Sequence, residues 1–206
     1  AKDLAKLNRN TAMLALALVR FGRFDEVQAL TETPTGIINI SMFNFAQGYA
    51  ALKDGDIDKA KETANDLWEL TETTNARFRF HDGKDILGTM AGILEGEIAW
   101  AEGSMEAALE AFQTATEYYD NLNYDEPEPL PFSPRHWSGA AYLEIEEYGK
   151  AAETYRRDLD DHPHNFWALF GMLQALGLLG QYDSVIDQDF EKTSQHADIW
   201  LSNTKF

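Results

Sequence analysis

The stretch WSGAAYLEIEEYGKAAETY, residues 137–155, contains the spacing on which the fold prediction depends. Gly139 precedes Ala151 by twelve residues, and a large residue, Tyr155, follows four residues later. The same spacing recurs twice upstream, in the sets Gly48, Ala60, Ala64 and Gly96, Ala108, Phe112. A glycine and an alanine allow two helices to approach closely where they cross, and the residue one turn later fills the adjacent gap. The pattern therefore predicts tight helical hairpins.

Outside these sets, apolar residues recur every three or four positions, which is the period of an amphipathic helix. One such series comprises Leu4, Leu7, Thr11, Leu14, Leu18 and Phe21. Strand-like alternation does not persist anywhere in the chain. Glycines and prolines divide the series into segments of helical length. We therefore predict an all-α chain of about ten helices.

The composition excludes several classes of partner and site. Among 206 residues, 35 are acidic and 17 are basic, which gives a net charge of −18 at pH 7. Such a charge repels nucleic acid phosphates and anionic lipids, so we expect neither nucleic acid nor a membrane as partner. There is no cysteine, and hence no disulfide, thiolate nucleophile or cysteine metal site. We expect a soluble chain whose compartment stays open, with the cytoplasm slightly favoured over the periplasm.

The hairpin pattern resembles the tetratricopeptide repeat (TPR), a 34-residue unit of two helices that pair through small residues and end near a proline. Residues 137–155 with Pro163 give the best copy, although Asp158 stands where that family has a small or aromatic residue. The resemblance implies a single α-solenoid domain over residues 1–206, with about five TPR-like hairpins and irregular loops between them. The expected hairpins are residues 1–33, 36–73, 83–121, 134–162 and 163–196, followed by a C-terminal tail, 197–206.

Several short segments also look like the C-terminal half of a bacterial TPR protein group. They are LEGEIA (94–99), YDEP (124–127), PR (134–135), DLDDHP (158–163) and WALFG (167–171). This resemblance implies further repeats upstream, and the missing initiator methionine agrees with a fragment of a longer array.

In TPR arrays the first helix of each hairpin lines a concave groove, so the resemblance implies which side chains face a partner. By register these include Arg9, Leu16, Arg20, Phe45, Tyr49, Lys53, Ile93, Glu97, Trp100, His136, Phe170 and Gln174. An aromatic groove with scattered charge suits an extended or helical peptide. We expect Phe45, Ile93 and Phe170 to pack between hairpins. The predicted partner-binding set is Arg20, Tyr49, Lys53, Glu97, Trp100, Arg135, His136 and Gln174.

The sequence contains few residues in the spacing that a catalytic or metal site requires. Glu95 and Glu97 are two carboxylates close in sequence, but residues two apart on a helix point about 200° apart, so they cannot share one site. His162 and His164 flank a proline at a repeat boundary, where an exposed turn is favoured over a metal site. No motif of a hydrolase, a phosphate-binding loop or a zinc protease is present. We predict no enzyme activity, no cofactor and no metal, and expect the acidic residues 158–161 to lie on the convex surface.

The segment YDEPEPLPFSPR, residues 124–135, holds four of the six prolines of the chain. Prolines favour extended backbone, so we predict an ordered insertion whose large side chains pack against the flanking helices. These side chains are Tyr124, Leu130, Phe132 and Trp137. Pro134 is expected to start the next helix and to leave Arg135 and His136 at the edge of the groove.

The sequence therefore predicts a non-catalytic scaffold module that binds a protein or peptide in the groove. The first alternative is a structural or self-associating segment, because the apolar residues Leu4, Leu7, Leu14 and Leu18 need a cover. The second alternative is an enzyme that acts on a small molecule in the groove.

Overall fold

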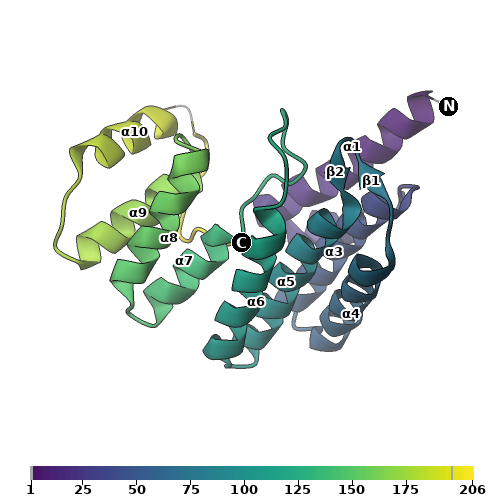
Figure 1. The fold of residues 1–206 in the computed structure, drawn as a ribbon, viewed down its shortest axis with the longest axis horizontal. Coiled ribbons are helices and arrows are strands. Elements are labelled where there is room, and N and C mark those ends of the chain that lie inside the picture. Colours follow the sequence, from purple (N-terminus) through teal and green to yellow (C-terminus); the bar gives the residue numbers. More distant parts are fainter. Residues whose placement is uncertain (1, 196) are drawn as a thin grey trace. The chain divides into compact units, whose positions relative to one another are not determined.

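The computed structural model describes the backbone of residues 2–195 and 197–206, and side chains from residue 10 onward within these ranges. The predictions for Leu4, Leu7 and Arg9 concern side chains outside the described residues. The described chain forms ten helices and one short β-ribbon (Figure 1), and this confirms the all-α prediction. The helices are α1 (Lys2–Arg20), α2 (Phe24–Gln28), α3 (Ile37–Lys53), α4 (Ile57–Thr73), α5 (Gly83–Ala101), α6 (Met105–Tyr119), α7 (Arg135–Glu144), α8 (Tyr148–Asp161), α9 (Phe166–Leu178) and α10 (Ser184–Ser194). The strands are β1 (Arg77–Phe78) and β2 (His81–Asp82).

The chain divides into two compact units, residues 1–132 and residues 133–206. The first unit contains α1 to α6 and the ribbon, and the second contains α7 to α10 and the tail. No helix in the described ranges combines the length and the apolar character needed to cross a bilayer.

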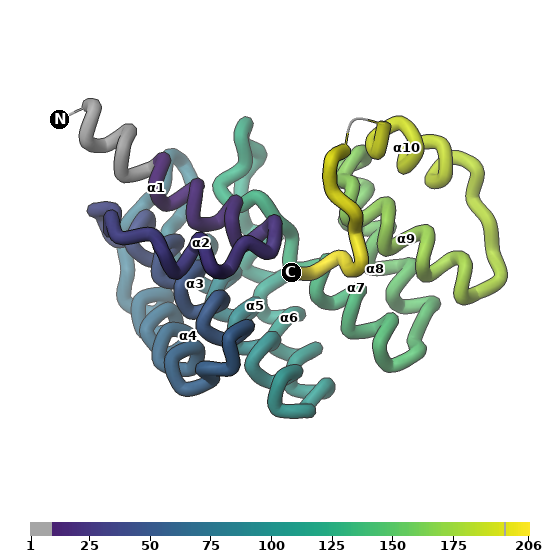
Figure 2. Tube along the Cα trace, turned by 180° about the vertical axis from the view of Figure 1, so that it is seen from behind, coloured from purple at the N-terminus to yellow at the C-terminus, as the bar shows by residue number. Residues whose placement is uncertain are grey.

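In the first unit, helices adjacent in sequence pack as pairs, with α3 on α4 and α5 on α6. The first helices of successive pairs also contact each other, so that α3 lies between α1 and α5 (Figure 2). Helix α2 is only five residues long. Thr31, Thr33 and Pro34 follow it, and β-branched residues and the position before a proline both disfavour continued helix.

At the helix crossings the glycine faces the large residue itself. A Cβ atom on Gly96 would overlap the Phe112 ring, and one on Gly139 would overlap the Tyr155 ring. At Gly48 the opposing residue is Thr63, and a Cβ atom there would lie 2.7 Å from the Thr63 side chain. The expectation that an alanine would meet each glycine was therefore wrong in detail, because the ring or the threonine uses the space that the missing side chain leaves.

Within the first unit, residues 124–132 of the proline segment pack on α3 and on the ribbon. Leu130 and Phe132 are buried, and the Phe132 ring lies 5.7 Å from the Phe45 ring of α3. Tyr124 is instead 83% exposed, contrary to the prediction. Asp125 binds His81 of β2 through Oδ2 and Nε2, 3.0 Å apart, and also pairs with Arg79. These contacts hold the segment on the ribbon. The strands of the ribbon are only two residues long, which is too short to give an alternating pattern in the sequence.

Candidate binding site

Helix α5 presents its two neighbouring carboxylates to different partners. Glu97 Oε2 lies 2.6 Å from Lys53 Nζ on α3. Glu95 Oε2 accepts a hydrogen bond from Trp68 Nε1 on α4, with a distance of 2.9 Å. The prediction that these carboxylates belong to separate sites is confirmed, and two surfaces of α5 need to be considered.

The first surface joins α3 to α5 and contains four of the predicted groove residues, Tyr49, Lys53, Glu97 and Trp100. The Lys53 ammonium lies 4.9 Å from the centroid of the Tyr49 ring and pairs with Glu97. Tyr49 and Glu97 are buried, whereas the Lys53 side chain is 27% exposed. Trp100 is half-buried, with its ring 6.4 Å from the Phe112 ring of α6.

An open groove lined by these residues was expected, and the structure corrects this for Arg20, Tyr49 and Glu97, all of which are buried. Helix α3 packs directly on both α1 and α5, and the ring of Phe24 stacks on Tyr49. Phe45 and Ile93 are fully buried, as expected for residues that pack between hairpins. Little of this surface apart from Lys53 and Trp100 is therefore accessible to a partner.

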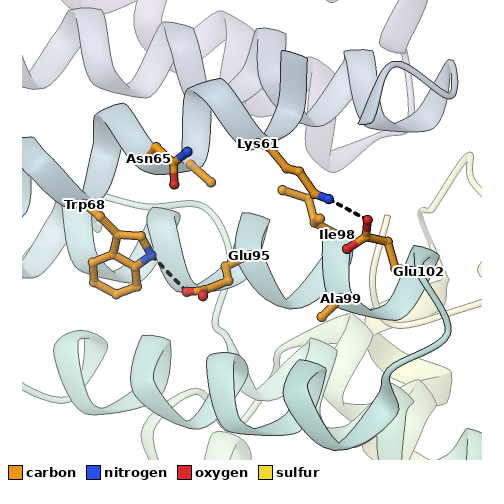
Figure 3. Close-up of a pocket in the computed structure, with 8 residues that line it drawn as sticks. Lys61, Asn65, Trp68, Glu95, Ile98, Ala99 and Glu102 are labelled. Atoms are coloured by element: carbon orange, nitrogen blue, oxygen red, sulfur yellow. Dashed lines mark hydrogen bonds and ion pairs between the residues drawn. The ribbon is translucent and has the colours of Figure 1, made fainter. Parts of the chain in front are cut away.

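The second surface is a pocket of about 320 Å³ between α4 and α5 (Figure 3). Its lining consists of Lys61, Ala64, Asn65, Trp68, Glu95, Ile98, Ala99 and Glu102. An ion pair between Lys61 and Glu102 closes one end, and the Trp68–Glu95 hydrogen bond closes the other (Figure 3). The Lys61 and Glu102 side chains are each 45% exposed.

The pocket follows from two rows of residues at helical spacing. Lys61 and Trp68 are seven residues apart on α4, and Glu95 of α5 is seven residues before the C-cap residue of that helix, Glu102. Each pair therefore lies on one face, two turns apart. Both spacings are present in the sequence. The TPR register, however, places only the first helix of each hairpin in the groove, and α4 is the second helix of its pair. Apart from Glu95, these residues were missed for that reason.

The second unit contains the remaining predicted residues, and only Gln174 is exposed. Arg135 and His136 are buried, which corrects their placement at a groove edge. His136 Nε2 lies 3.1 Å from Asp158 Oδ2, and neither side chain is exposed. The His136 side chain, in the first turn of α7, therefore points inward to its buried partner on α8.

Asp158 also corrects the expectation that residues 158–161 are part of an exposed acidic coat. Asp160 and Asp161 are exposed, whereas Asp158 is fully buried. Burial alone would raise the pKa of Asp158. The charge of His136 and hydrogen bonds from His136, His162 and Ser133 outweigh burial and hold the pKa well below its ordinary value. The carboxylate is therefore a charged, bonded part of the core.

The histidines do not form a metal site in the part of the chain that the structure describes. His162 lies against Asp158, with its Nδ1 atom 3.7 Å from Oδ1, while Pro163 and His164 are exposed in the turn. No group of three or more metal-ligating side chains occurs within the described ranges. The His136–Asp158 and His81–Asp125 pairs do not line the α4–α5 pocket, and they hold segments of the chain in place.

No protein family, curated protein or solved structure matches the chain. The functional proposal therefore depends on the geometry of the pocket and on the charge of the molecule.

Proposed function

We propose that this chain is a non-catalytic binding module, built as a TPR-like α-solenoid of about five hairpins, that binds a basic segment of a partner protein. The observation that carries the proposal is the α4–α5 pocket, in which an indole and two carboxylates surround a space of about 320 Å³. This volume suits one long side chain of a partner.

The pocket favours a lysine or arginine side chain. A cation over the Trp68 ring gains about 0.5–2 kcal/mol from the cation–π interaction. The Glu95 carboxylate, bonded to the indole N–H, lies beside that ring and supplies the opposite charge. The net charge of −18 adds long-range attraction for a basic partner, which mainly raises the rate of association.

The same lining supports binding rather than catalysis. No histidine, serine, threonine or tyrosine lines the pocket, so it offers no imidazole and no hydroxyl nucleophile. Each carboxylate already has a donor, Trp68 for Glu95 and Lys61 for Glu102. A partner cation would replace these donors at the carboxylates, and no covalent bond is broken in this exchange.

The proposal is tested by selecting binders from a displayed library of random peptides on the full chain. We expect the selected peptides to contain lysine or arginine, and Trp68→Ala or Glu95→Gln to weaken their binding about tenfold. Glu110→Gln, an exposed charge change on α6, is the matched control and leaves binding unchanged.

A comparison with the α3–α5 surface separates the two candidate sites. If the pocket is the site, Lys53→Ala combined with Trp100→Ala leaves the affinity for the selected peptides intact. Loss of binding in that variant, with normal binding by Trp68→Ala, would assign recognition to the α3–α5 surface instead.

A second candidate function, self-association, is favoured by the exposed face of α1. Leu14 lies on this helix and Phe21 directly follows its last residue, Arg20, and the two side chains are 49% and 52% exposed. Leu18 is buried by the chain itself, so it needs no further cover. Light scattering on the wild type and on Leu14→Glu distinguishes the possibilities, because a dimer through α1 dissociates in the variant, whereas a monomer in both counts against this function.

A further inference from the structure

Tyr155 of α8 occupies a slot between two helices of the second unit. A Cβ atom on Gly139 of α7 or on Gly171 of α9 would overlap the Tyr155 ring. Only glycine at both positions leaves room for a ring there. The phenol therefore extends between α7 and α9, and its hydroxyl reaches the tail, residues 197–206.

The Tyr155 hydroxyl binds Thr204 of the tail, with 2.7 Å between Oη and Oγ1. Thr204 Oγ1 in turn donates to the backbone carbonyl of His136, at 2.8 Å. A threonine hydroxyl has one hydrogen, so the Tyr155 hydroxyl donates to Thr204. Two residues further on, Phe206 packs edge-on against Trp137, with ring centroids 4.6 Å apart.

Packing alone does not require the hydroxyl. In the α5–α6 pair, Phe112 fills the equivalent space beside Gly96 with a ring that has no polar atom. Tyr155 thus carries an oxygen that Phe112 lacks, and this oxygen binds the tail.

Most side chains of the tail are exposed or half-buried. Thr204 is its buried residue, while Ser202 and Asn203 are exposed and Trp200 is fully exposed. Asn203 Oδ1 accepts from the backbone N–H groups of Thr204 and Lys205, which fixes a local turn around the anchoring threonine. Because only one of its side chains is buried, we expect the tail to open without unfolding the helices beneath it.

We propose that the Tyr155 hydroxyl, the His136 carbonyl and the Trp137 ring form a peptide-binding site that the tail occupies as an internal ligand. Its partner is an extended segment of another protein with a threonine or serine followed two residues later by an aromatic residue, which replaces Thr204 and Phe206. This site goes beyond the α4–α5 pocket and belongs to the other unit, so the failure of either proposal leaves the other standing.

The test uses the full chain and a fluorescent peptide, ADIWLSNTKF, which repeats residues 197–206 and is capped at both ends. A Thr204→Val, Phe206→Ala variant weakens the chain's own tail, and we expect it to bind the peptide at least about tenfold more tightly than the wild type. Adding Tyr155→Phe to this variant keeps the ring in its slot, removes the hydroxyl and lowers the affinity about tenfold. Tyr142→Phe, which removes a hydroxyl elsewhere in α7, is the matched control.

Hydrogen exchange on the wild type gives an independent readout. We expect the amides of residues 201–206 to exchange faster than those of α7 and α8. Equal rates, or a tail variant that no longer folds by circular dichroism, would show that the tail is an inseparable part of the core and would overturn the proposal.

Three further results would also overturn it. One is a folded tail variant that does not bind the peptide, and another is binding that Tyr155→Phe leaves unchanged. The third is a wild-type dimer that disappears in the tail variant, because the site would then take the tail of a second copy and not a foreign segment.

Discussion

Asp158 carries a buried charge in the second unit, and the stability of this unit depends on the groups that pair with that charge. The carboxylate is fully buried, pairs with His136 and receives a contact from His162. We predict that Asp158→Asn lowers the free energy of unfolding of the second unit by about 3–5 kcal/mol, because the variant leaves a buried cation without its counter-charge. Urea unfolding of the variant and the wild type measures the change. Asp160→Asn, exposed on the same helix, serves as control and is expected to fall within about 0.5 kcal/mol of the wild type.

The same residue predicts a dependence of stability on pH. The pKa of Asp158 is lower in the folded chain than its ordinary value of 3.8, so below that value the unfolded chain binds the proton more readily. The stabilisation is therefore complete above about pH 4 and is lost progressively as the pH falls further. In Asp158→Asn, this part of the acid destabilisation is expected to be absent. Equal slopes for variant and wild type between pH 5 and pH 2 would contradict the assignment.

Asp85 provides a contrast of opposite sign. Burial raises the pKa of this carboxyl above 3.8, although Lys84 and Asn121 oppose the effect. The folded chain therefore holds the Asp85 proton more tightly than the unfolded chain, and stability falls as the pH rises through this range. We predict that Asp85→Asn removes that loss, so that its unfolding free energy relative to the wild type increases from pH 3 to pH 7. A denaturant titration at each pH measures it, and a decrease over the same interval would refute the prediction.

At the scale of elements, the α5–α6 pair depends on three glycines at successive turns of α5. Gly88 faces the Tyr118 ring and Gly96 faces the Phe112 ring. A Cβ atom on Gly92 would lie 2.9 Å from the carbonyl oxygen of Ala111. The two backbones therefore approach at the middle of the pair and accommodate rings on either side.

This arrangement predicts opposite effects for two changes from glycine to alanine inside helices. Gly96→Ala is expected to cost about 1–3 kcal/mol, because its methyl group displaces the Phe112 ring. Gly149→Ala on α8 meets no atom within 4 Å, and is expected to stabilise the chain by about 0.5–1 kcal/mol through helix propensity. Thermal and urea unfolding measure both. If Gly96→Ala were neutral, the packing described for this pair would be wrong.

The elements were largely predictable because the glycines and the apolar period are local signals. The contacts between distant segments were not. Nothing near Asp158 in the sequence indicates that His136, 22 residues earlier, lies opposite it. Likewise, Thr204 and Tyr155 are 49 residues apart, and the tail has no periodicity that would predict its position. For the candidate site, helix geometry predicted that the Glu95 and Glu97 side chains point in different directions. Trp68 was not predicted, because it lies on the second helix of a hairpin and the repeat register places only first helices in the groove.

At the scale of the whole molecule, each of the two units has its own buried core. In the first, the core lies among α1, α3, α4, α5 and α6, and in the second it lies around Tyr155 with α7, α8 and α9. Cores that are separate in this way unfold as separate cooperative units when few contacts connect them. A single free energy of unfolding then does not describe the chain.

This division predicts that two destabilising variants act on different parts of the chain. Asp158→Asn is expected to increase hydrogen exchange in α7 to α9 and to leave α3 to α6 at the wild-type rate, because its lost ion pair lies within residues 133–206. Gly96→Ala is expected to do the reverse, since the Phe112 ring that it displaces lies within residues 1–132. Exchange measured by mass spectrometry on peptides from both units, in mild denaturant, separates the effects. If either variant accelerated exchange equally throughout the chain, the two units would have to unfold together, and the free energies predicted for both substitutions would apply to the whole molecule.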